Sequence, residues 1–202
     1  MSRHGSQQPV APQGLLDAAG AVLARNPSAT MAEIAATAGV ARATLYRHFP
    51  TREDLIKALA LESLRRTDEA TQQIPVDRLS AERVLAEVFD AIVPLGDRFR
   101  FLSSEPAALG DPEIKAAYDR QLDELAELVD AMKAEGSLDR AAPTAWVVAV
   151  IDALVYAAWE AVDAGAVARR DAAGLAFRTI MRGLGSADPA STSPGKRRSA
   201  QR

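Results

Sequence analysis

Helical periodicity without strand-like alternation is the feature that most limits what this chain of 202 residues can fold into. Apolar residues recur three or four positions apart through most of the sequence. Alanine, the strongest helix former, makes up roughly a fifth of the chain. No four-residue run alternates apolar and polar residues with the β-branched enrichment of a strand. The pattern therefore predicts an all-α protein.

The composition excludes several kinds of chemistry. Because the chain has no cysteine, it cannot form a disulfide, a thiolate metal site or a thiol nucleophile. Its two histidines, His4 and His48, offer neither a Ser-His-Asp triad nor a polyhistidine metal site, since His4 lies in a polar leader. We expect no cofactor, no metal and no enzymatic activity. Without an export signal or an uninterrupted membrane segment, the expected location is the cytoplasm.

Caps and helix breakers divide the chain into two tails and two helical domains. Residues 1–11 and 186–202 are polar, the second ending in a basic stretch, and we expect both to be flexible because they offer little to bury. The first domain spans residues 12–60, with its last helix continuing to about residue 72 as a linker, and the second spans residues 73–185. The expected helices cover residues 12–24, 30–38, 41–48, 52–72, 80–93, 97–109, 112–135, 143–164 and 171–184.

Residues 30–49 have the spacing of a helix-turn-helix motif. Thr30 and Glu33 form a capping box at the start of a two-turn helix, and Gly39 supplies the left-handed turn that follows it. In the next short helix Leu45 and Phe49 are four positions apart and are expected to face the core. The remaining positions of that helix then face solvent or DNA. The motif predicts a DNA-binding function for the first domain.

The charge distribution agrees with that function. Residues 1–66 carry eight Lys and Arg against five Asp and Glu, a balance of +3, which leaves −6 for the rest of a chain whose total is −3. A basic front end on an acidic body confines nucleic-acid contacts to the first third of the chain.

The segment TMAEIAATAGVARATLYRHFPTREDLIKALA, residues 30–60, resembles the N-terminal DNA-binding domain of the TetR family of bacterial transcriptional regulators. The LYxHF core and the charged start of the following helix carry the resemblance. It implies a three-helix DNA-binding domain, a helical ligand-binding and dimerisation domain, and a homodimeric, ligand-responsive repressor acting on a pseudo-palindromic operator. Ala41 departs from the Ser or Thr that often caps the recognition helix in this family. The implied DNA-binding residues are Thr30, Arg42, Ala43, Thr44, Tyr46, Arg47, His48 and Arg52.

Within this set the expected contacts differ. Arg42, Ala43 and Thr44 occupy the start of the recognition helix, where similar proteins touch base edges, whereas Tyr46, His48 and Arg52 fall at phosphate-contacting positions. A cation in the first turn of a helix is disfavoured by the helix dipole, so helix stability does not explain an arginine at the first of these positions. A guanine base or a phosphate group opposite Arg42 would explain it. Arg47 is expected to add only nonspecific electrostatic attraction to the DNA.

The second domain is expected to contain a ligand pocket and a dimer interface. The helix over residues 143–164 is apolar nearly all round and needs two partners, one of which would be its copy in a second subunit. The expected interface consists of Val147, Val150, Leu154, Ala158, Val162, Phe177, Ile180, Met181 and Leu184. The candidate pocket residues are Phe89, Phe99, Phe101, Tyr118, Trp146, Asp152 and Tyr156.

The sequence leaves two roles open for Asp152. With Tyr156 four positions away on the same helix, its carboxylate would recognise a cationic or polar group in a pocket, or it would lie at the rim of the dimer interface. The partners expected from the sequence are double-stranded operator DNA, a small-molecule effector and a second copy of the chain. Two alternatives stay open: a regulator controlled by a partner protein, and a helical enzyme that uses carboxylates.

Overall fold

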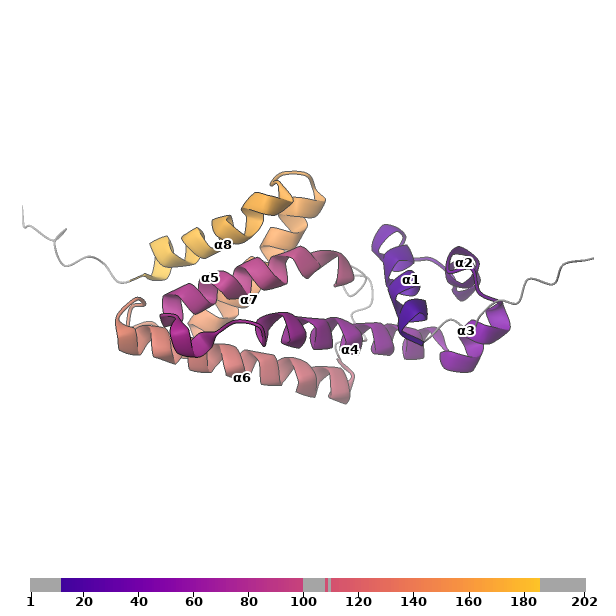
Figure 1. Ribbon diagram of the computed structural model, residues 1–202, viewed down its shortest axis with the longest axis horizontal. Coiled ribbons are helices and arrows are strands. Elements are labelled where there is room, and N and C mark those ends of the chain that lie inside the picture. The colour runs from indigo at the N-terminus through magenta and orange to yellow at the C-terminus, as the bar shows by residue number, and fades with distance from the viewer. Residues whose placement is uncertain (1–11, 100–107, 109, 186–202) are drawn as a thin grey trace, which may run out of the picture.

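The structure, a computed structural model, describes residues 12–99, 108 and 110–185. Its elements within those residues are α1 (Pro12–Arg25), α2 (Met31–Thr37), α3 (Arg42–His48), α4 (Arg52–Thr71), η1 (Val76–Arg78), α5 (Ala81–Ile92), η2 (Val93–Arg98), α6 (Pro112–Glu135), α7 (Thr144–Asp163) and α8 (Arg169–Leu184). The helices α1, α2 and α3 form a unit at one end of the molecule, and α4 runs from this unit along the larger body of α5 to α8 (Figure 1).

Capping side chains set where the short helices begin. The Glu33 carboxylate accepts a hydrogen bond of 2.7 Å from the Thr30 N–H, and Thr30 Oγ1 accepts one of 3.3 Å from the Glu33 N–H, which confirms the predicted capping box. Thr51 and Asp54 form a second box at the start of α4, with distances of 3.0 and 3.1 Å. Each such cap contributes about 1 kcal/mol. Gly39 has φ of 68°, the left-handed backbone expected at the turn.

The N-terminal unit has its own apolar core. The largest fully buried side chains in this core come from α1, α2, α3 and α4: Leu15, Leu23, Ile34, Leu45 and Leu55. Phe99 and Ile114, which lie far along the chain, pack into the same cluster. The unit is therefore held to the body by shared packing as well as by the continuous α4.

A second core lies among α5, α6, α7 and α8. Its largest fully buried side chains are Leu85, Phe89, Met132, Leu138, Ile151 and Ile180. By length and composition alone α7 could cross a membrane. In this fold one face of α7 packs into the core and the other face stays uncovered.

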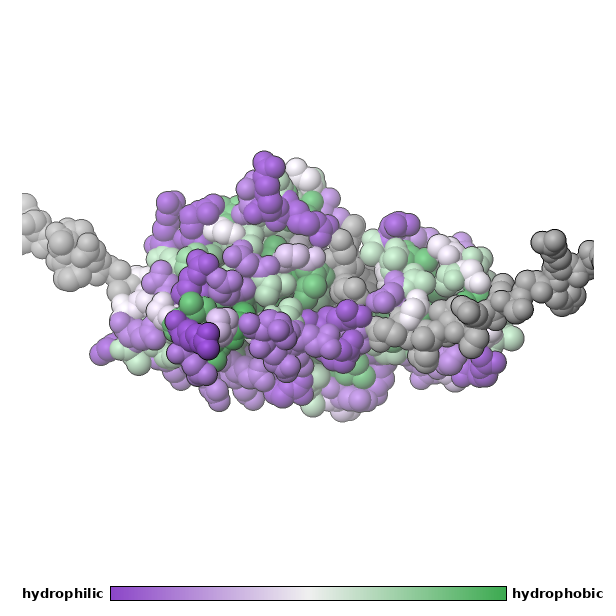
Figure 2. Space-filling view, viewed as in Figure 1, coloured by the Kyte–Doolittle hydropathy of each residue, from purple (hydrophilic) through white to green (hydrophobic). Residues whose placement is uncertain are grey.

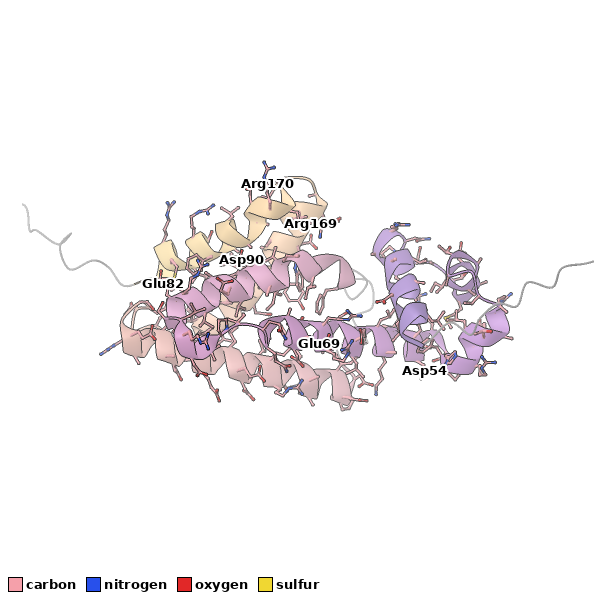
Figure 3. All side chains as sticks on the ribbon, viewed as in Figure 1. Asp54, Glu69, Glu82, Asp90, Arg169 and Arg170 are labelled. Atoms are coloured by element: carbon pink, nitrogen blue, oxygen red, sulfur yellow. The ribbon has the colours of Figure 1, made fainter. Side chains whose placement is uncertain are left out.

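Hydrophilic residues make up most of the face of the body shown in Figure 2, with smaller hydrophobic patches among them. Figure 3 shows Glu82 and Asp90 on α5 and Arg169 and Arg170 at the start of α8, all near the outside of the body. This face is ordinary hydrated surface.

Polar contacts join α4 to α6 at two points. Near the N-terminal unit, Lys57 Nζ bridges Asp111 at 3.1 Å and Glu113 at 2.9 Å, and these contacts raise the pKa of the lysine and lower that of Asp111. Further along, Gln121 Nε2 donates a hydrogen bond of 2.6 Å to Asp68. A shift of α4 against α6 would have to break one of these contacts.

The observed helix ends lie within two residues of the expected ones, except at residues 97–109. There the chain forms η2, a 3-10 helix over Val93–Arg98 that follows α5 directly and begins four residues before the expected helix. Pro94 fits the start of such a turn, since proline lacks the N–H that a continuing α-helix would need at that position. The rest of that expected helix and both expected tails lie outside the described residues.

Candidate nucleic-acid interface and ligand pocket

The short helix α3 separates a buried face from an exposed one. Leu45 and Phe49 are 0% and 8% exposed, as the spacing predicted. The opposite side of the helix, with a half-buried Thr44 at its edge, consists of exposed residues: Arg42, Ala43, Tyr46, Arg47 and His48. Six of the eight predicted DNA-binding residues therefore lie on the exposed or half-buried side of α3, and Thr30 lies at the cap of the neighbouring α2.

The start of α3 has no side-chain cap, as Ala41 predicted. Arg42, the first residue of the helix, has an exposed side chain. The dipole of α3 disfavours a cation there, so the stability of the helix does not explain the arginine. Its position is suited to an anion or a guanine supplied from outside.

A hollow of about 650 Å³ brings four of the predicted residues together: Thr30, Arg42, Tyr46 and Arg52. Arg52 differs from the other three. Its guanidinium donates hydrogen bonds to the backbone oxygens of Ala29 at 2.5 Å and Pro27 at 2.7 Å. Arg52 thus ties the loop between α1 and α2 to the start of α4, a role that the sequence reasoning missed. An arginine at a helix start carries no sequence signal that separates carbonyl binding from phosphate binding.

A second pocket, of about 510 Å³, lies between α4, α5, α6 and α7. Aliphatic and aromatic side chains make up most of its lining. Five of the seven predicted pocket residues line it: Phe89, Phe99, Tyr118, Asp152 and Tyr156. The structure therefore brings together side chains from four separate segments at the place where a ligand was expected.

Trp159 is a lining residue that was not among the candidates. Its ring stacks on Phe99 with a centroid distance of 4.8 Å and an interplanar angle of 11°, and it meets Tyr156 edge-on at 5.1 Å and 79°. Trp159 lies seven positions after Asp152 and three after Tyr156, which puts all three on one face of α7. That spacing was a signal that could have found it.

Asp152 faces the pocket, and its partner there is a phenol. The Tyr118 hydroxyl hydrogen-bonds to the Asp152 carboxylate. Burial raises the pKa of Asp152, and the hydrogen bond from Tyr118 opposes this rise only in part. Burial also raises the pKa of Tyr118 and Tyr156, so both phenols are neutral. A partly desolvated carboxylate with neutral neighbours gains free energy when a cation approaches it.

Two predicted pocket residues are not placed in the pocket. Trp146 is 60% exposed and does not line the cavity, so that prediction was wrong. It lies six positions before Asp152, and six positions turn an α-helix to its other side. Phe101 lies outside the described residues.

Three of the nine residues predicted for the dimer interface are buried within the chain itself, so the prediction was wrong for them. Val147, Ala158 and Ile180 are buried inside the body, at 0%, 8% and 1% exposure, so they are unavailable to a second copy. They face inward because α7 and α8 pack on each other and on α5 and α6. The half-buried members are Val150, Leu154, Val162, Phe177, Met181 and Leu184. Beside them Ala149, Ala153 and Ala157 form an exposed stripe along α7.

Comparison with known proteins identifies relatives of both parts. Residues 15–59 match the family described as bacterial regulatory proteins, tetR family. The HTH-type transcriptional repressor LfrR of Mycolicibacterium smegmatis is 33% identical over 154 residues, which are 76% of this chain and 79% of that protein. The similarity to LfrR therefore extends well beyond the helix-turn-helix motif.

Solved structures agree in fold. The crystal structure of the TetR-like regulator LfrR from Mycobacterium smegmatis in complex with proflavine gives a TM-score of 0.70 at 32% identity, covering 85% of this chain and 94% of that one. The TetR family regulator PfmR from Thermus thermophilus gives 0.68 at 17% identity, covering 84% and 98%. The second likeness is one of fold alone.

Proposed function

The chain belongs to the TetR family of bacterial regulatory proteins, and we propose that it is a homodimeric repressor that releases its operator when a planar aromatic cation enters the pocket. Members of this family are DNA-binding transcriptional regulators and not enzymes. One observation carries the class of effector: five acidic residues and several aromatic rings line the pocket, and no Lys, Arg or His does so among the described residues.

Asp152 is the lining carboxylate best placed to meet a ligand. Asp68 is already paired with an arginine at 2.9 Å, and Glu135 accepts a hydrogen bond of 2.9 Å from the N–H that begins α5. Glu124 and Glu127 are exposed on the side of α6. Asp152 is partly desolvated, and its neighbour is a neutral phenol. A cation in the pocket would therefore gain most from approaching this carboxylate.

The aromatic rings favour a flat ligand. Trp159, Phe99 and Tyr156 already interact through ring faces and edges, so a planar π system can replace or extend these contacts at little cost. The LfrR complex supports this class of ligand, because proflavine is itself a planar aromatic cation. The pocket volume of about 510 Å³ is within the range of small-molecule sites.

Titration of Asp152→Asn with proflavine tests this proposal. The loss of one charge-assisted contact is expected to weaken proflavine binding about 10- to 100-fold. The matched control, Asp123→Asn, changes an exposed carboxylate on α6 outside the pocket and should bind like the wild type. Because burial raises the pKa of Asp152, acidification should protonate it and weaken wild-type binding, whereas the asparagine variant should lack this pH dependence. Equal affinity of the three proteins for proflavine would refute Asp152 as the anchor.

On the DNA side, we infer that α3 enters the major groove. In a homodimer two such helices would lie about 34 Å apart and reach successive grooves on one face of a pseudo-palindromic operator. Arg42, Ala43 and Thr44 would then meet base edges. Thr30, Tyr46 and His48 would meet phosphates, and Arg47 would add general attraction. Arg52 would act through the loop that it holds.

The uncovered face of α7, together with α8, is our proposal for the dimer contact. The exposed alanine stripe allows a second helix to approach closely, and the half-buried Val150, Leu154 and Phe177 flank it. A second copy would complete a four-helix interface and remove this apolar face from water.

We place the protein in the cytoplasm, where its operator is. Footprinting across its own promoter region would identify the operator.

A further inference from the structure

Trp159 is the one described residue that packs against both apolar cores. Its half-buried ring contacts the cluster of the N-terminal unit and the cluster of the body. The same ring lines the ligand pocket. A ligand that touches this indole therefore touches a side chain that belongs to both halves of the molecule.

The indole is held from several sides by the segment that follows α5. Trp159 Nε1 donates a hydrogen bond of 3.1 Å to the Val93 backbone oxygen at the start of η2. Phe99, directly after η2, stacks on the ring. Between them Gly96 lies so close that a Cβ added there would be 2.3 Å from Trp159 Cδ1. Only glycine fits at this position while the indole keeps its place.

The other side of η2 contacts the DNA-binding unit. Leu95 packs against the N-terminal core, and Phe99 is a buried member of it. η2 contacts α1 directly, and Pro94 and Leu95 line a small hollow together with Leu16 and Leu59. η2 thus lies directly against α1 and α4, the helices that support the helix-turn-helix motif.

We propose that Trp159 is the positioning residue that couples occupation of the pocket to the DNA-binding unit. An aromatic ligand competes with Phe99 for the face of the indole, shifts the ring, and with it moves η2 through the Val93 hydrogen bond and the contact at Gly96. α1 and α4 then change their relative position, and the two recognition helices lose their spacing. This inference rests on the proposed function, which makes the pocket the effector site.

The first test needs no ligand. Gly96→Ala forces the indole out of its position, and we expect operator affinity to fall about 5- to 150-fold without effector, a typical range for allosteric coupling. The operator probe is a duplex that the wild-type protein selects from random sequences. Gly110→Ala is the matched control, because a Cβ there meets nothing within 4 Å. Wild-type affinity in Gly96→Ala would overturn the proposal.

A second background separates this effect from general damage to the fold. Trp159→Leu removes most of the ring, so adding Gly96→Ala to it creates no clash, and we expect the added change to leave operator affinity unaltered. An equal loss of affinity in both backgrounds would show that Gly96 acts without the indole, which contradicts the proposal. Thermal unfolding of each variant verifies that it is folded at the assay temperature.

The third arm uses proflavine as the probe. For the wild type we expect saturating proflavine to lower operator affinity, and for Trp159→Phe, which keeps a ring but loses the N–H donor, we expect the ratio of affinities without and with proflavine to fall toward one. A variant ratio equal to that of the wild type refutes the coupling role of Trp159. Failure of the wild type to bind proflavine would instead refute the proposed effector class, and the Gly96 arms would still decide the role of Trp159.

Discussion

The helix-turn-helix unit and the body differ in how far a residue's surroundings follow from its neighbours in the chain. In the unit, α3 has only seven residues, and Leu45 within it and Phe49 directly after it pack into the core while its other side is exposed or half-buried. In the body, α7 is apolar nearly all round, and its periodicity leaves open which face meets the core, the ligand or a second subunit. The surfaces of a short helix with few apolar residues thus follow from its own sequence, whereas those of a long apolar helix depend on what packs on it.

The largest expected effect tests the surface of α7 left for a second copy. Ala153→Glu puts a charge in the centre of the exposed alanine stripe, and burying it unpaired in a dimer would cost about 3 to 5 kcal/mol. Sedimentation analysis should then detect monomers where the wild type forms dimers. Ala116→Glu, at an exposed alanine of α6, should remain dimeric. If Ala153→Glu remained dimeric, the interface would lie elsewhere, and the exposed alanine face of α7 would not be the dimer contact.

A somewhat smaller effect is expected from the two faces of α3. Leu45→Ala removes a fully buried side chain and should lower the free energy of unfolding by about 2 to 5 kcal/mol in urea titrations. Arg47→Ala, two positions along on the exposed face, should change it by less than about 0.5 kcal/mol. If the two substitutions lowered the free energy of unfolding equally, α3 would not have one buried and one exposed face.

DNA affinity provides the third contrast. Arg42→Ala should weaken operator binding by about 1 to 3 kcal/mol without altering the dimer. The control Arg170→Ala, at the start of α8 in the body, should bind as the wild type does (Figure 3). A base contact at Arg42 also predicts relaxed preference at one position of the site, whereas a phosphate contact predicts uniform weakening. Unchanged affinity would exclude this face of α3 from the interface.

The sequence was most informative where local rules decide the structure. The capping box at Thr30, the turn at Gly39 and the buried pair Leu45 and Phe49 all follow from short-range spacing, and all were confirmed. The helical fold and the helix boundaries, apart from those expected at residues 97–109, followed for the same reason.

The sequence was least informative where distant segments meet. Arg52 binds carbonyl oxygens more than 20 residues away, and Trp159 contacts Val93, 66 positions earlier. The burial of Val147 and Ile180 depends on how α7 and α8 pack on α5 and α6, which periodicity in a uniformly apolar helix cannot fix. Trp146 was misplaced because its aromatic character was considered without its position around the helix.

The most direct test of the whole account is the affinity of the wild-type protein for its selected operator duplex, measured by fluorescence anisotropy with and without saturating proflavine. If the acidic, aromatic cavity controls the recognition helices, proflavine should weaken DNA binding about 5- to 150-fold. Proflavine that binds between α4 and α7 while operator affinity stays the same would contradict the central claim.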